Sequence, residues 1–101
     1  MRICLYSTLR GACGIQELVP DPAPATVRAA LLWLGEQVPV LRPRLFTAEG
    51  HLHERLVVFC NGRHIRFLQG EDTPLQAGDV LALFPKTGEQ RAFAHLSPDW
   101  R

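Results

Sequence analysis

Residues 56–67 read LVVFCNGRHIRF, two apolar-rich runs separated by the pair Asn61-Gly62. Asn-Gly is the preferred pair for a two-residue type I′ turn, in which both central residues adopt positive φ. We therefore expect a β-hairpin whose first strand is 56–60 and whose second strand is 63–67. The alternation of residue types in the second strand predicts that Ile65 and Phe67 share one face, opposite to the charged side chains.

The N-terminal half supplies two further strands and one helix. Residues 1–9 mix β-branched, aromatic and apolar side chains, which predicts a strand, and residues 16–19 can pair back on it. The prolines that follow lack a backbone donor and end this pairing. Thr26 then provides a residue type that is favoured as a helix N-cap. After it, apolar residues recur at spacings of three and four as far as Val38. This predicts one amphipathic helix, followed by an irregular segment over 41–53.

The last apolar run is residues 80–84, VLALF, which Pro85 ends. Because this run is apolar on both faces, it predicts a strand inside the sheet. The order strand, strand, helix, hairpin, strand predicts an α+β domain, with a mixed sheet of four to five strands and one main helix across one face. If the last strand lies beside the first, the arrangement is a β-grasp, although the pattern alone leaves other α+β topologies open.

Composition limits the classes of partner and location. The chain has 101 residues, of which 47% are apolar, and a formal net charge of +1, which fits one small domain. No apolar stretch reaches the roughly 20 residues of a membrane-spanning helix, and the N-terminus lacks the apolar core of a secretory signal. The near-neutral charge, without a basic stripe, argues against nucleic-acid binding. We expect a cytoplasmic domain with neither a nucleic-acid nor a membrane partner.

No pattern of residues indicates a catalytic or metal centre. The nucleophile-elbow, zinc-protease and phosphate-loop motifs do not occur in the sequence. His51 and His53 would lie on one side of an extended segment, but no Cys or carboxylate evidently converges on them to complete a metal site. The three cysteines, Cys4, Cys13 and Cys60, match no zinc or redox spacing. We expect no catalytic residue, no metal ligand and no bound cofactor, and therefore a protein that is not an enzyme.

Three motifs follow one another between residues 60 and 85. They are NGR at 61–63 in the hairpin, DTPLQAGD at 72–79 in the next loop and VLALFP at 80–85 in the last strand. Together they resemble the MoaD/ThiS family of ubiquitin-like sulfur carriers, which includes the small subunit of molybdopterin synthase. The resemblance covers about residues 1–86 and implies a ubiquitin-like β-grasp domain over 1–86, with a C-terminal extension over 87–101.

The chemistry that this resemblance implies resides at the C-terminus. The family pattern ends in Gly-Gly, whose carboxylate an activating enzyme adenylates before sulfur transfer makes a thiocarboxylate. Residues without Cβ let such a tail extend through a narrow channel. Here the chain continues through Lys86, Thr87 and Gly88 to Arg101 without a Gly-Gly pair. These three residues are the candidates for a carrier tail, and a thiocarboxylate could form only at Gly88, after cleavage behind it.

Three interpretations of the extension stay open. In the first, cleavage after Gly88 leaves a one-glycine carrier. In the second, the domain keeps the fold and the partner surface but transfers no sulfur. In the third, the fold serves an unrelated binding role.

The resemblance implies a larger partner enzyme, either an activating enzyme or a protein like the large subunit of molybdopterin synthase. One helix cannot cover both faces of the last strand, so its apolar side chains are candidates for the partner surface. They are Leu81, Leu83, Phe84 and Pro85, with Val80 and Ala82 as the alternative on the other face. Alternatively, the extension covers the exposed face through Phe93 or Leu96.

The function expected from the sequence is that of a non-enzymatic member of this carrier family. It would present its tail and one sheet face to the partner, in molybdopterin, tungstopterin or another sulfur-transfer biosynthesis. The alternative is a β-grasp interaction or regulatory module that carries no sulfur.

Overall fold

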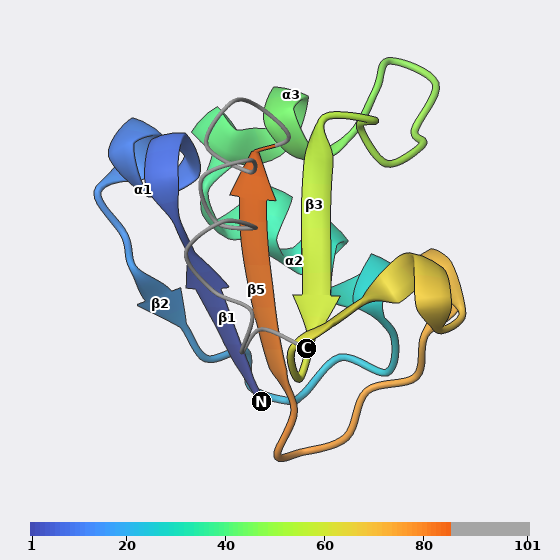
Figure 1. Ribbon diagram of the computed structural model, residues 1–101. Coiled ribbons are helices and arrows are strands. Elements are labelled where there is room, and N and C mark those ends of the chain that lie inside the picture. Colours follow the sequence, from blue (N-terminus) through green and yellow to red (C-terminus); the bar gives the residue numbers. More distant parts are fainter. Residues whose placement is uncertain (86–101) are drawn as a thin grey trace.

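The computed structural model of the chain describes residues 1–85, which form one sheet with helices packed on it (Figure 1). The strands are β1 (Arg2–Leu5), β2 (Glu17–Leu18), β3 (Leu56–Cys60), β4 (Arg63–His64) and β5 (Val80–Pro85). The α-helices are α1 (Ser7–Cys13), α2 (Val27–Gln37) and α3 (Arg42–Leu45). Three short 3-10 helices are η1 (Pro39–Leu41), η2 (Ile65–Phe67) and η3 (Gly70–Asp72).

The sheet has the strand order β2-β1-β5-β3-β4. The last strand, β5, lies in the middle, parallel to β1 and antiparallel to β3. Both edge strands are two residues long, and each pairs antiparallel with its neighbour. A parallel pair of the first and last strands, with a helix crossing between them, is the β-grasp arrangement, which the order of elements alone left open beside other α+β topologies. The predicted α+β ubiquitin-like β-grasp, a mixed sheet with one main helix across one face, is confirmed.

Helix α2 begins and packs as the residue spacing predicts. The side-chain oxygen of Thr26 accepts a hydrogen bond from the backbone N–H of Ala29, 3.1 Å away, and so caps the helix. The predicted apolar stripe lies against the sheet and is buried. It consists of Val27, Ala30, Leu31, Leu34 and Val38. Burying this stripe is the main source of the helix's stability, because an isolated helix of this length is marginal in water.

The predicted first strand over residues 1–9 is too long. It ends at Leu5, and residues 7–13 form helix α1 instead. Leu9, only 2% exposed, anchors this helix in the core. Gly14 ends it in the left-handed region at φ 74°, where its N–H donates to the carbonyl of Arg10. The tertiary contact of one leucine therefore decides between strand and helix here.

The hairpin turn is confirmed, but the second strand is shorter than predicted. Asn61 and Gly62 adopt φ 54° and φ 84°, as a type I′ turn requires. After His64 the chain turns into the 3-10 helix η2, in which Ile65 is buried and Phe67 is 67% exposed. The prediction that these two side chains share a face is therefore wrong. The Nδ1 atom of His64 accepts from the N–H of Arg66 and so caps the short helix.

The segment over residues 41–53 is more regular than expected. It contains α3, and an isolated bridge then pairs Phe46 with Leu52 across a turn at Gly50. Leu41 and Leu45 are fully buried, so this segment forms part of the core. No helix within residues 1–85 is long and apolar enough to cross a membrane.

Candidate functional site

The two faces of β5 have different surroundings. Side chains paired across neighbouring strands point to the same face, so Leu81 and Leu83 lie with their partners in β1 and β3 against α2. Both leucines are 0% exposed and belong to the core. The prediction that they form part of a partner-binding surface is therefore wrong, because neither side chain reaches the surface.

The opposite face of the sheet carries the remaining candidate of the strand interior, Phe84. Phe84 pairs with Val57 of β3, and Ala82, two residues earlier in β5, pairs with Phe59. Helix α2 lies behind the sheet, and within residues 1–85 no helix crosses this front face (Figure 1). Phe84 and Val57 are each 2% exposed, yet neither joins the core cluster beneath α2. The front face is thus a second apolar layer.

Five rings form a continuous row across this face. The Tyr6 ring stacks on that of Phe84, with centroids 4.7 Å apart, and Phe84 meets Phe59 edge to face at 5.7 Å. Phe59 then meets His64 at 5.5 Å, and His64 meets Phe67 at 6.3 Å. We call these five residues the aromatic row. The two rings of such an offset or edge-to-face pair attract each other, and this attraction adds to the stability gained from their buried apolar area.

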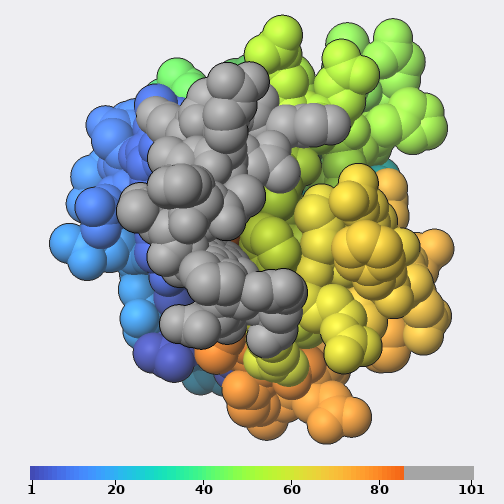
Figure 2. All heavy atoms as spheres, in the orientation of Figure 1, coloured from blue at the N-terminus to red at the C-terminus, as the bar shows by residue number. Residues whose placement is uncertain are grey.

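The row reaches the molecular surface at both ends. Phe67 is 67% exposed and lies under the guanidinium of Arg66, whose Cζ is 4.9 Å from the ring centroid. The segment from η2 to η3, yellow to amber in the space-filling view, projects beside the front face (Figure 2). At the other end Tyr6 is 36% exposed. Partial burial, and then the interaction with Cys4, raises the pKa of the Tyr6 hydroxyl.

Strand β5 ends beside the Tyr6–Phe84 end of this row. Pro85, its last residue, pairs with Leu56 at the start of β3. Phe84 belongs to the aromatic row, while Pro85 is half-buried at the rim. Lys86, Thr87 and Gly88, the candidates for a carrier tail, lie outside the described residues, as does the extension over 87–101. The aromatic row therefore includes a residue at the end of β5 that precedes the candidate tail in sequence.

A network of hydrogen bonds fixes the other end of β5. The amide nitrogen of Asn61 donates to Asp79 Oδ1 and its oxygen accepts from the N–H of Val80, both at 3.0 Å. The backbone N–H of Gln76 donates to Asp79 Oδ2 at 2.9 Å. The Asn61 amide, and then the Gln76 N–H, lower the pKa of the Asp79 carboxyl. This network sets the hairpin against β5 and thereby holds Phe59 beside Phe84.

Groups able to hold a metal do not gather in the described part of the chain. Within residues 1–85 no cluster of three or more His, Cys, Asp and Glu side chains could bind one. The Nδ1 atom of His53 accepts from the N–H of Arg55, and His51 is exposed in the preceding turn. Burial raises the pKa of the Cys60 thiol, with a further contribution from Asp79, which keeps the thiol protonated.

The aromatic row is the feature that sequence reasoning missed. Its rings come from separate segments, so only strand register and the path of η2 bring them together. A usable signal was nevertheless present, because Phe59 and Phe84 both occur in runs predicted as sheet strands.

Comparison with known proteins decides the family. The sequence pattern of the ThiS family matches residues 4–88. The chain belongs to the ThiS family. This is a family of ubiquitin-like sulfur-carrier and modifier proteins, as the motifs at residues 61–85 indicate. A search of curated protein sequences returns no match to the chain.

Solved structures of similar fold include SAMP1, a small archaeal modifier protein of Haloferax volcanii. It is 31% identical, with a TM-score of 0.75 over 85% of this chain and 93% of its own. A chain of the BexX/CysO complex of Amycolatopsis orientalis is 23% identical, with a TM-score of 0.72 over 85% and 94%. A Pyrococcus furiosus protein described as molybdopterin converting factor subunit 1 is 20% identical, with a TM-score of 0.65 over 85% and 95%. The last two likenesses show the fold alone.

Proposed function

We propose that this ThiS-family protein is a non-enzymatic carrier that presents its C-terminal segment to a larger partner enzyme in the cytoplasm. The aromatic row carries the proposal. It lies on the sheet face that no helix of residues 1–85 crosses, and it includes Phe84, one residue before the end of β5. A partner that binds Phe67 and the rings beside it would hold the sheet while it acts on the chain beyond Pro85.

For sulfur transfer we propose that cleavage behind Gly88 creates the reactive end. The freed glycine carboxylate would be adenylated with release of pyrophosphate. Hydrosulfide would then attack the acyl adenylate and displace AMP, which leaves a thiocarboxylate. Lys86, Thr87 and Gly88 would form the whole tail beyond the last strand, and a terminal glycine has no Cβ to hinder approach to its carbonyl carbon.

Intact-mass spectrometry of the protein purified from its own host tests this chemistry. We expect a species that ends at Gly88, part of it heavier by the replacement of one oxygen with sulfur. A population that ends only at Arg101 would overturn the carrier proposal. Alkylation offers a control, because a thiocarboxylate at the chain end reacts with iodoacetamide even after the three cysteines are replaced by serine.

The partner proposed for this chemistry is an activating enzyme or a protein like the large subunit of molybdopterin synthase. One structural neighbour belongs to a complex with a second protein, and another is described as a subunit of molybdopterin converting factor. Both support a protein partner in general terms, and molybdopterin biosynthesis is the setting that we propose first among the sulfur-transfer routes. Deleting the gene and measuring molybdopterin in the host tests this setting: an unchanged molybdopterin content would exclude it.

A second candidate function is an interaction module that carries no sulfur. It is favoured by the sequence after Gly88, which continues to Arg101 and contains Phe93, Leu96 and Trp100. In that case the intact segment contributes to partner binding or to stability. Removing residues 89–101 should then weaken one of the two. An unchanged melting temperature and unchanged partner capture would count against the module.

A further inference from the structure

A hollow of about 230 Å³ lies at the exit of β5 and is distinct from the aromatic row. Leu56 and Pro85, which pair across β3 and β5, line it together with residues of α1, α3 and the loop before β3. Pro85 alternates with Phe84 along β5, so the two side chains point to opposite faces of the sheet. The chain therefore leaves the domain with the aromatic row on one side and this hollow on the other.

The charge of the hollow is of one sign. Arg44, His53 and Arg55 line it, and among residues 1–85 no carboxylate does. Glu54 lies between two of these residues in sequence but is not part of the lining. We call this site the basic hollow.

The two arginines of the basic hollow are uncompensated. Both are exposed, and neither forms an ion pair with any residue in the range 1–85. By contrast, Arg2 pairs with Glu17 at the far edge of the sheet, at 3.5 Å. Unpaired guanidinium groups around one hollow contribute little to the fold, and they are free to bind an anionic group.

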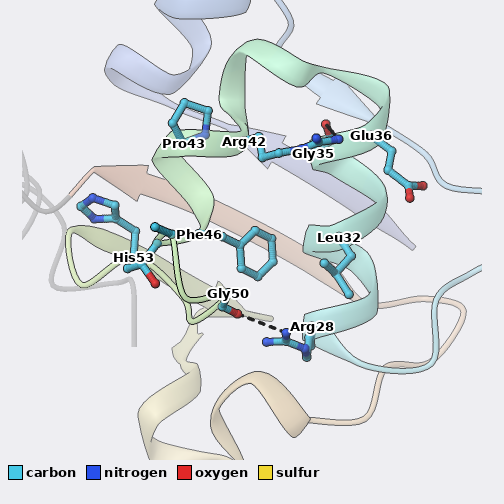
Figure 3. A pocket seen from close by; sticks show the side chains of 11 residues that line it. Arg28, Leu32, Gly35, Glu36, Arg42, Pro43, Phe46, Gly50 and His53 are labelled. Atoms are coloured by element: carbon cyan, nitrogen blue, oxygen red, sulfur yellow. Dashed lines mark hydrogen bonds between the residues drawn. The ribbon is translucent and has the colours of Figure 1, made fainter.

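Other arginines nearby are already engaged in holding the structure together. Pro43 and His53 also line a larger groove of about 880 Å³ between α2 and α3, which Figure 3 shows with Phe46 at its centre. In this groove Arg28 forms an ion pair with Glu71 and donates to the Gly50 carbonyl at 3.1 Å. Arg42 donates to the carbonyl of Gly35. Of the arginines that line this groove or the basic hollow, Arg44 and Arg55 are therefore the two whose guanidinium groups form no hydrogen bond or ion pair within residues 1–85, and both lie at the β5 end.

We propose that the basic hollow docks a carboxylate-bearing segment of the protein that handles the C-terminal tail. The inference rests on the proposed function, because it assumes that a partner takes hold of the chain beyond Pro85. Such a partner lies beside the hollow, and Asp or Glu side chains match the guanidinium fork in bidentate geometry. The partner then makes apolar contact with the aromatic row and ionic contact with Arg44 and Arg55. These contacts lie on both sides of the end of β5 and fix the direction of the tail.

The test uses the full chain and a synthetic hexaglutamate peptide as the acidic segment. Amide chemical shifts measured by NMR during the titration should change at residues 44–45 and 53–56. The double variant Arg44→Glu, Arg55→Glu should weaken the apparent affinity by about tenfold or more, because two attractive contacts become repulsive. The matched control is Arg63→Glu, an exposed arginine in β4 at the opposite end of β3, which should bind like the unmodified chain.

The outcomes separate this proposal from its alternatives. Shifts spread evenly over all exposed arginines, or equal loss of affinity in the control and the double variant, would overturn it. Inorganic phosphate, added in a parallel titration, should bind more weakly than the peptide at the same amides; tighter phosphate binding would replace the acidic segment with a phosphate ligand. The peptide result does not depend on tail cleavage, so failure of the carrier chemistry and failure of the docking site are distinguishable.

Discussion

Replacing Leu83 by alanine tests whether the last strand turns its leucines into the core. Leu83 is 0% exposed and sits in register between Leu5 of β1 and Val58 of β3, beneath α2. A Leu→Ala change at such a site loses transfer free energy and leaves a cavity, and costs about 2.7–5 kcal/mol. With neighbours on both sides in the central strand, we expect a loss of about 3 kcal/mol in the free energy of unfolding.

The assay is urea unfolding followed by circular dichroism, with thermal unfolding alongside. At about 4–8 °C per kcal/mol for a domain of this size, the melting temperature should fall by roughly 12–24 °C. Leu83→Met preserves volume and should cost less than about 1.5 kcal/mol, and Val19→Ala, at a 60% exposed site, should change stability by no more than about 0.5 kcal/mol. A loss below about 1 kcal/mol for Leu83→Ala would refute the burial argument and return this residue to the candidate partner surface.

Changes at four further sites probe the cap, the turn, the Asp79 carboxylate and the aromatic row. Thr26→Ala removes the α2 cap and should cost about 0.5–2 kcal/mol by urea unfolding, while Thr26→Ser should retain most of the stability. Asn61→Gly keeps the positive φ but loses the side-chain hydrogen bonds, and should cost about 1–2 kcal/mol; Asn61→Ala should cost more. Because the Asp79 pKa is lowered from 3.8, its stabilising contribution is present above pH 3.8 and is lost as the pH falls through the lowered pKa, so Asp79→Asn should flatten the acid limb of the stability curve. Phe67→Ala should change the free energy of unfolding by no more than about 0.5 kcal/mol and still reduce recovery of the partner enzyme in pull-downs; undiminished recovery would place the partner elsewhere.

The elements that the sequence predicts well are those whose signals are local. Helix α2 has both a cap at Thr26 and a stripe of apolar residues, and the turn at Asn61-Gly62 depends on two residues with an intrinsic preference for positive φ. Helix α1 has neither signal at its start. It is seven residues long, and the burial of Leu9 against the core favours it.

The candidate site depends on pairing between distant strands, which no single segment encodes. A one-residue change of register exchanges the two faces of a strand, so periodicity in an all-apolar run such as residues 80–84 cannot say which side chains are buried. For the same reason the prediction included both Leu83 and Phe84, and only the second belongs to the front face. At Ile65–Phe67 the alternating residue types fit a strand, but the His64 cap and the burial of Ile65 favour a turn of 3-10 helix.

The brevity of both edge strands limits how another polypeptide can attach. Recognition by strand addition needs a row of unpaired backbone N–H and C=O groups along an exposed edge. Here β2 offers two residues before Pro20, and β4 offers two before the chain coils into η2. Short edges interrupted in this way also protect a sheet from edge-to-edge aggregation. Within the described part of the chain, a partner must therefore recognise side chains rather than an exposed strand edge. Its selectivity then depends on ring packing and charge, and not on backbone hydrogen bonds.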